Sequence, residues 1–440
     1  MNASSSRKST SRELVERALA AIEDPRGEGA RTFLRVHRDA ALSAADRIDN
    51  DSRMGARPLP LAGMPISIKD NFDEAGVVTL AGSKVLVGTP PAARDSIVVE
   101  RLRAAGAVII GRTNMTEFAY SGLGINPHYG TPRNVHDRGS ARVPGGSSSG
   151  AAISVTDGMA TAAIGTDTGG SVRIPAALNG LVGFKPTARR VPLDGVLPLS
   201  LTLDSAGPIA RTVTECVRLD RVLSASSAEL PAIHLRGLRL AVPQAVVLDD
   251  LSPAVSSAFA RVLARLSAAG ATIVDLPYAV FARAAEVNPR GAISSAEAYW
   301  WHREWLKQGD AYDPRVAMRI RPGEAVSAAD YIELLRQRRR FVQDVETALN
   351  GCDAMLMPTT PDTAPTIAEA VASDASYFRF NSRMLRNPSL VNLFDGCALS
   401  LPCHAPGGAP IGLTIAGTQC QDDRVLAIGL AIEALQPGAT

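Results

Sequence analysis

The sequence predicts an α/β protein with a largely parallel or mixed sheet, and three observations lead to this prediction. Segments of helical periodicity alternate with short apolar segments, as at 95–110. The same order of helix, glycine and strand returns at 252–274. The chain of 440 residues is long enough for one large α/β unit, or for about two or three domains of ordinary size.

The first helix is expected to begin after Thr10, which forms a capping box with Glu13. In such a box the hydroxyl and the carboxylate accept hydrogen bonds from N–H groups that the first helical turn leaves free. Apolar residues then repeat at helical spacing from Leu14 to Ile22. This pattern predicts an amphipathic helix near the start of the chain.

A strand is expected within 61–69, because apolar side chains alternate with other residues along this segment. A helix follows at about 95–105, and Gly106 stops it. The apolar residues 107–110 then predict the next buried strand.

The second half of the chain repeats this order. Ser252 and Pro253 open a helix that carries apolar residues on one face, and Gly270 closes it. A strand is expected at 272–274. Short buried strands that alternate with helices are typical of α/β proteins.

No linker separates clear domains, although 224–229 divides a motif-rich first half from a more variable second half. The second half carries all three tryptophans. At this spacing we interpret them as a helix that packs into the core, in preference to an aromatic pocket wall: Trp300, Trp301 and Trp305. The basic run at 336–340 lies in a helical pattern, and we interpret it as a solvated helix face.

The composition excludes several classes of protein. Lys and Arg exceed Asp and Glu by only two, which argues against partners such as nucleic acids or acidic membranes. No apolar stretch approaches the roughly 18 to 20 residues of a spanning helix, and the first ten residues lack the apolar centre of a signal peptide. The five cysteines follow no CxxC spacing, which argues against a disulfide framework and a thiolate metal site. We therefore expect a cytoplasmic enzyme.

Two glycine pairs each stand directly before a serine. Residues 145–146 precede Ser147, and residues 169–170 precede Ser171. Glycine allows backbone N–H groups to turn toward a ligand without a Cβ in the way. Consecutive amides that point into one concavity can bind an anion, as in an oxyanion hole.

Other motif interpretations are weaker. The segment 146–150 formally fits the G-x-S-x-G nucleophile elbow around Ser148, but no buried strand precedes it. The segment 165–170 has the glycine spacing of a phosphate loop, but Ser171 and Val172 stand where lysine and a hydroxyl residue are required. The six histidines are scattered without a local signature. A Ser-His-Asp triad stays open, because its members meet only in space.

A nucleophilic serine needs a group that activates it, because a serine hydroxyl is a poor nucleophile at neutral pH. Lys69 is a candidate, since it ends an apolar strand. Burial there would lower its pKa, and a neutral amine is a competent general base. Taken alone, a lysine at a strand end is more often a surface side chain.

Lys69 and the segments 145–150 and 165–175 together resemble the amidase signature family of serine amidases. The similarity runs from about Thr10 to the C-terminus and is strongest over 61–212. Further matching blocks lie at 111–118, 130–134, 183–187 and 203–208. The resemblance implies a single large α/β/α sandwich around a central mixed β-sheet. It also implies that residues 1–440 form a single amidase domain. This domain would have a motif-rich core at about 60–212 and a variable part that shapes the substrate pocket at about 225–390.

The resemblance also implies roles for individual residues. Ser171 would be the nucleophile, Ser147 the bridging serine that follows a cis peptide bond, and Lys69 the base. The oxyanion hole would be formed by the backbone N–H groups of four consecutive residues: Thr168, Gly169, Gly170 and Ser171. Three residues match positions that support the site through hydrogen bonds: Ser148, Asp167 and Arg173.

An amidase of this family would form an acyl-enzyme on Ser171 and release a carboxylic acid with ammonia or an amine. It would need no cofactor or metal, its partner would be a small-molecule amide, and the family suggests a homodimer. The substrate stays open among carboxylated, ureido, aryl and alkyl amides. Two alternatives remain: the amide-hydrolysing chain (the A subunit) of a tRNA-dependent amidotransferase, and a non-catalytic binder that kept the fold.

Overall fold

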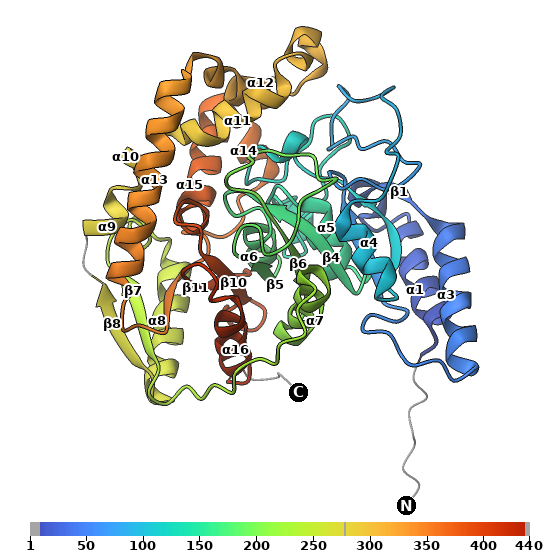
Figure 1. The fold of residues 1–440 in the computed structure, drawn as a ribbon, viewed down its shortest axis with the longest axis horizontal. Coiled ribbons are helices and arrows are strands. Elements are labelled where there is room, and N and C mark those ends of the chain that lie inside the picture. Colours follow the sequence, from blue (N-terminus) through green and yellow to red (C-terminus); the bar gives the residue numbers. More distant parts are fainter. Residues whose placement is uncertain (1–8, 277–278, 436–440) are drawn as a thin grey trace, which may run out of the picture.

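The computed structural model describes residues 9–276 and 279–435, and these residues form one mixed sheet of eleven strands with helices on both faces (Figure 1). In spatial order the strands are β1 (Phe33–Val36), β3 (Val108–Thr113), β2 (Pro65–Lys69), β4 (Ala162–Asp167), β6 (Ser205–Ala210), β5 (Val182–Lys185), β10 (Cys397–Pro402), β11 (Gly412–Gly417), β9 (Ala354–Pro358), β7 (Arg239–Pro243) and β8 (Thr272–Leu276). The strands β3, β2 and β4 are parallel, as are β9, β7 and β8, and antiparallel pairs join the two groups.

Two layers of helices cover the sheet. One face packs against α4 (Ile97–Ala104), α7 (Val213–Ser224), α8 (Pro253–Ala268) and α16 (Asp422–Glu433). The other face packs against α1 (Ser11–Glu23), α3 (Arg38–Arg53), α5 (Ser149–Thr156), α6 (Arg173–Leu178), α13 (Ala328–Ala348) and α15 (Asp374–Leu393). In Figure 1, α1 and α3 lie at one end of the sheet beside β1, and α8 lies at the other end with β7 and β8.

The remaining helices are short. They are α2 (Gly29–Thr32), α9 (Ala279–Ala282), α10 (Ala284–Val287), α11 (Ala292–His302), α12 (Pro314–Ile320) and α14 (Ile367–Val371). Within the described ranges, 3-10 helices lie at 117–119, 138–140, 289–291, 305–311 and 321–325.

The central strands are apolar on both faces because both faces are covered. In β9, Ala354 and Leu356 pack into the cluster under α7 and α16, whereas Met355 and Met357 pack into the cluster under α13 and α15. Successive side chains of a strand point to opposite faces, so one strand contributes to both cores. The α/β fold with a large central mixed sheet is confirmed.

The predicted elements of the first half are confirmed with small shifts. The capping box of Thr10 and Glu13 is present at the start of α1. The helix expected at 95–105 is α4, and Ser96 caps its N-terminus. The strand expected within 61–69 is confined to β2, because 61–64 form a turn closed by the Met64 N–H and the Leu61 carbonyl.

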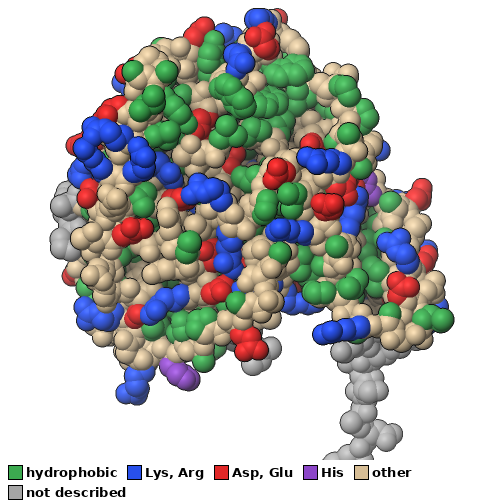
Figure 2. Space-filling view, viewed as in Figure 1, with side chains coloured by type: hydrophobic (Ala, Val, Ile, Leu, Met, Phe, Trp, Pro, Cys, Tyr) green, Lys and Arg blue, Asp and Glu red, His purple; other side chains and the backbone are tan. Residues whose placement is uncertain are grey.

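The second half brings one correction. The basic run on α13 is not wholly a solvated face, because the side chain of Arg338 is buried. Its guanidinium donates to the carbonyl oxygens of Asn392 and Leu393, where α15 ends. Arg336 follows the expectation and pairs with Glu333 at the surface. Acidic and basic side chains are interspersed over the face shown in Figure 2.

The tryptophans divide between core and surface. Trp301 stacks on Trp305 with ring centroids 6.4 Å apart, and it contacts Phe118. These contacts confirm the core interpretation for Trp301 and Trp305, whereas Trp300 is half exposed. Within the described ranges, no helix combines the length and the apolar character that crossing a membrane requires.

Candidate active site

Lys69 ends β2 with its side chain fully buried. Its Nζ donates to Ser147 Oγ at 2.8 Å and to Thr166 Oγ1 at 2.7 Å. Thr166 lies on β4, which pairs with β2 in parallel, so the sheet brings the two side chains together. Lys69 and Ser147, two members of the triad that the resemblance implies, thus lie in hydrogen-bond contact, and Thr166 joins them.

Burial lowers the pKa of Lys69 from 10.5 to about 7, while the charges of Asp204 and Asp167 act in the opposite direction. No carboxylate lies within ion-pair distance of the Lys69 ammonium among the described residues. A lysine in this setting exchanges a proton near neutral pH.

The two glycines before Ser147 allow a close approach of backbones. Gly145 has φ +76°, and a Cβ on Gly146 would lie 2.4 Å from the backbone nitrogen of Gly124. The peptide bond between Gly146 and Ser147 is cis, as the resemblance implies. Ser147 is fully buried beside Lys69.

Ser171 lies in the loop between β4 and α6 and lines a cavity of about 540 Å³. Of the predicted triad, Ser171 lines this cavity, whereas Lys69 and Ser147 do not. Within the described residues its hydroxyl makes no hydrogen bond to Ser147, although the two lie in segments that meet: the Ser148 N–H donates to the Ser171 carbonyl oxygen at 3.3 Å. The Ser148 hydroxyl donates to the Thr166 carbonyl oxygen at 3.4 Å, which ties the same two segments.

Three successive side chains at the end of β4 have different partners. Thr166 contacts Lys69, Asp167 points to the opposite side of the strand, and Thr168 turns back to donate to Asp204. Burial raises the pKa of Asp204 to about 6, against the effect of the hydrogen bond from Thr168.

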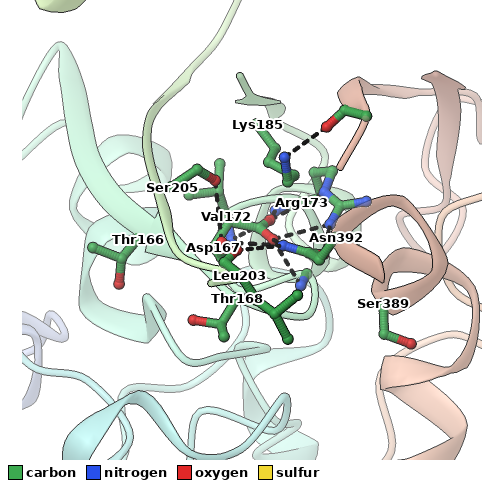
Figure 3. Close-up of polar contacts among 12 residues, drawn as sticks. Thr166, Asp167, Thr168, Val172, Arg173, Lys185, Leu203, Ser205, Ser389 and Asn392 are labelled. Carbon is green, nitrogen blue, oxygen red and sulfur yellow. Dashed lines mark hydrogen bonds and ion pairs between the residues drawn. The ribbon is translucent and has the colours of Figure 1, made fainter. Parts of the chain in front are cut away.

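Asp167 holds the loop that carries Ser171 (Figure 3). Its carboxylate accepts hydrogen bonds from the N–H groups of Gly170 and Val172 and pairs with the guanidinium of Arg173. Asn392, on α15, donates to Asp167 at 2.9 Å and accepts from Arg173 at 2.7 Å. Figure 3 shows Asp167 beside these two side chains, with dashed lines that mark its contacts to both. The supporting position expected for Asp167 and Arg173 thus has a clear geometric basis.

Buried groups of opposite charge shift the pKa values in this network. Burial alone would raise the pKa of Asp167, but the positive charges of Arg173 and Lys185 hold it well below its usual value. Burial lowers the pKa of Lys185 to about 8, and its Nζ donates to the carbonyl oxygens of Pro186 and Gly396.

The loop leaves backbone donors free beside Ser171. The N–H groups of Thr168, Gly169 and Ser171 have no acceptor among the described residues. Gly170 differs from the expectation, because its N–H already donates to Asp167 at 2.8 Å. Three free amides next to a serine hydroxyl form a site that can stabilise an oxyanion.

The sequence interpretation missed three residues of this site. Thr166 and Asp204 lie inside blocks that carry the resemblance, so the signal for them was present. Asn392 stands 225 positions after Asp167 and has no local motif. None of the six histidines lines the cavity beside Ser171, and His37 and His128 pair with glutamates elsewhere.

Comparisons with known proteins identify the family to which the chain belongs. A family model described as Amidase matches residues 13–426. The chain is 36% identical over 400 residues to a 2-amino-5-chloromuconic acid deaminase of Comamonas testosteroni, covering 90% of this chain and 86% of that one. It is 35% identical over 462 residues to a mandelamide hydrolase of Pseudomonas putida, covering 98% and 89%. A glutamyl-tRNA(Gln) amidotransferase chain (the A subunit) of Symbiobacterium thermophilum is 34% identical over 459 residues, covering 96% and 92%.

A solved structure described as an amidase superposes with a TM-score of 0.87 at 33% identity, covering 98% of this chain and 97% of that one. The sequence matches and this superposition both extend over nearly the whole chain. The chain belongs to the amidase signature family.

Proposed function

We propose that the protein hydrolyses the C–N bond of a small carboxylic amide through an acyl-enzyme on Ser171. One observation carries this proposal: a buried lysine with a pKa of about 7 contacts Ser147, next to a loop that presents Ser171 and three free N–H groups. A base, a hydroxyl relay, a nucleophile and an oxyanion site are the groups that acyl transfer requires.

In the acylation step, Ser171 Oγ bonds to the amide carbon while its proton passes to Ser147 Oγ. The proton of Ser147 passes in turn to neutral Lys69 Nζ. The carbonyl oxygen becomes an oxyanion that accepts hydrogen bonds from the free N–H groups of Thr168, Gly169 and Ser171. Each such donor lowers the barrier by about 3–4 kcal/mol in a comparable site.

Collapse of this intermediate breaks the C–N bond, and the nitrogen leaves with the proton returned from Lys69 through Ser147. Water then attacks the ester carbon and gives its proton through Ser147 to neutral Lys69. Collapse breaks the bond to Ser171 Oγ, which takes the proton back along the relay as the acid is released. The proposal requires the hydroxyls of Ser147 and Ser171 to come within hydrogen-bond distance when substrate binds, as catalytic contacts often tighten only in the complex. The whole chain acts as one domain in this scheme.

The test combines labelling and turnover. A fluorophosphonate probe should label the wild type on Ser171 and leave Ser171→Ala unlabelled, as read by mass spectrometry. Ammonia release from a panel of primary amides should be lost in Ser171→Ala and retained in Ser149→Ala, which changes a neighbouring serine outside the relay. Labelling at another residue, or turnover by Ser171→Ala, would contradict the proposal.

The similarity to an amidotransferase chain supports a second candidate, in which ammonia passes to a partner chain. Steady ammonia release by the purified chain alone would decide for the amidase. Dependence of turnover on added partner chains would decide for the amidotransferase. A protein that binds amides but is neither labelled nor active would be a non-catalytic binder.

We further propose a cytoplasmic location and a homodimer. All five cysteines are free in the structure, as is usual in a reducing compartment. Cell fractionation and light scattering of the purified chain test the two statements.

A further inference from the structure

The cavity beside Ser171 has walls from distant parts of the chain. Thr168, Gly169 and Ser171, in the loop after β4, line the cavity. Residues of α15 between Phe378 and Leu393 also line it. The segment from α10 to α11 and the helix α12 supply further lining residues. Among the described residues that line it, the only charged side chains are three arginines: Arg290, Arg319 and Arg386.

None of these arginines has an acidic partner within 4 Å among the described residues. Arg383, one turn earlier on α15, differs because it pairs with Asp250 and Asp362. Like charges that share a partly enclosed cavity repel one another, and an anion placed between them removes this repulsion.

Arg319 is held in a fixed orientation. Its Nη1 donates to the carbonyl oxygen of Tyr120 at 2.5 Å, and its guanidinium lies 4.3 Å from the centre of the Tyr120 ring. Nε and Nη2 have no hydrogen-bond acceptor in the described part of the chain. An arginine fixed by one nitrogen and one ring face presents its remaining donors without further loss of side-chain freedom.

Arg386 has an unsatisfied donor. Its Nε donates to Asn387 Oδ1 at 3.1 Å, but Nη2 is buried and makes no hydrogen bond. Burial lowers the pKa of Arg386 and the neighbouring charge of Arg383 acts in the same direction, whereas Asp249 and Asp250 oppose them. Nη1 also has no acceptor among the described residues and is not buried in this way, so it is the donor of Arg386 that a ligand oxygen can reach.

The rest of the lining suits a short hydrocarbon chain with one more polar contact. Leu199, Leu203 and Leu385 supply apolar surface. Asn381 accepts hydrogen bonds at Oδ1 from the Ser121 hydroxyl and the Gly122 N–H, which leaves its Nδ2 as a donor for the cavity.

We propose that the substrate is an amide that carries a carboxylate, and that Arg319 and Arg386 bind this carboxylate while Ser171 attacks the amide carbon. The planar guanidinium group matches the two oxygens of a carboxylate. Arg290, exposed in the turn at 289–291, adds positive potential that attracts the anion. This inference rests on the proposed function of Ser171 and specifies its substrate class.

The test compares monoamides of dicarboxylic acids, over a series of chain lengths, with uncharged alkyl amides of the same lengths. The best carboxylated amide should exceed its uncharged counterpart in kcat/KM by about tenfold to a hundredfold. Arg319→Gln and Arg386→Gln should each reduce this preference by about tenfold through a higher KM. In both variants the loss of kcat/KM should be larger for the carboxylated amide than for the uncharged amide.

Two controls complete the design. Arg340→Gln removes an exposed cation of α13 outside the cavity and should leave the preference intact. Arg386→Lys keeps the charge without the planar fork and should retain part of the preference. A dicarboxylate should inhibit the wild type competitively, and this inhibition should weaken as salt increases.

The two proposals fail in distinguishable ways. Equal turnover of charged and uncharged amides, with no change of their ratio in the arginine variants, would overturn the carboxylate inference and leave Ser171 chemistry intact. If neither class is hydrolysed, calorimetry with Ser171→Ala still decides: tighter binding of the carboxylated amide supports the inference, and equal binding overturns it.

Discussion

The ammonium of Lys69 lies 2.7 Å from the hydroxyl of Thr166, slightly closer than its 2.8 Å contact with Ser147. The Thr166 hydroxyl also accepts a hydrogen bond from Asn71 at 3.2 Å. Lys69 is therefore oriented by a strand residue that takes no part in the proton relay. An acceptor at this position favours the charged form of the lysine, against the burial that lowers its pKa.

Thr166→Val should lower the pKa of Lys69 further, because the ammonium loses an acceptor while the shape of the site is kept. Loss of one charge-assisted hydrogen bond, about 1.5–3 kcal/mol, corresponds to about one to two pKa units. The inflection of kcat/KM against pH should move to lower pH by this amount. Thr156→Val, at the end of α5, is the control and should leave the inflection in place. An unchanged inflection in Thr166→Val would contradict the role of this contact.

The pH profile of the wild type follows from the pKa of about 7 for Lys69. The base acts in its neutral form, so kcat/KM should rise with pH and reach a plateau above about pH 8. Lys69→Arg should lower kcat/KM by about 10²- to 10⁴-fold, because guanidinium stays protonated over this range. A flat wild-type profile from about pH 5 to 10, or an active Lys69→Arg, would exclude Lys69 as the base.

Stability should depend on pH through the same group. The pKa of Lys69 is about 7 in the folded chain, against 10.5 for a lysine in the unfolded chain. Between pH values equal to these two pKa values, the unfolded chain therefore binds more protons than the folded chain. The free energy of unfolding of the wild type, relative to Lys69→Met, should therefore rise with pH across this window and be level below it. Urea titrations at several pH values measure the difference. A relative stability that falls as pH rises would show that the folded pKa is not depressed.

The network around Asp167 should behave as a buried ion pair. Arg173→Met leaves the Asp167 carboxylate buried without its cation and should cost about 3–5 kcal/mol of unfolding free energy. The double variant Asp167→Asn/Arg173→Met removes both charges and should cost less than Arg173→Met alone. Denaturant unfolding of the three proteins tests this order. A double variant less stable than Arg173→Met would contradict this prediction.

The sequence was most informative where contacts are encoded in short segments. The capping box at Thr10, the glycine pairs before Ser147 and Ser171, and the helix after Ser252 each depend on neighbours in the chain. The roles in the candidate site came from the family resemblance that such segments carry, and their geometry became visible only in the fold.

Contacts between distant helices could not be predicted in this way. Arg338 lies in a basic run that is typical of a solvated face, yet its donors bind the carbonyl groups at the end of α15. Asn392 reaches Asp167 only because α15 packs beside α6. Arg319 and Arg386 have no motif around them, and only the fold places both in one cavity. Periodicity alone likewise could not separate the core position of Trp301 from the exposed position of Trp300.

The alternation at the end of β4 constrains how this chain can change in length. Thr166, Asp167 and Thr168 each need a particular side of the strand, and successive side chains alternate. A one-residue insertion or deletion between Ala162 and Thr166 would exchange these sides, so that a carboxylate would face Lys69 and the Ser171 loop would lose its anchor. A substitution in β4 changes one of these contacts, whereas a change of length changes all of them at once. Libraries that diversify this protein should therefore keep β4 fixed in length and place insertions in the exposed loop at 226–234.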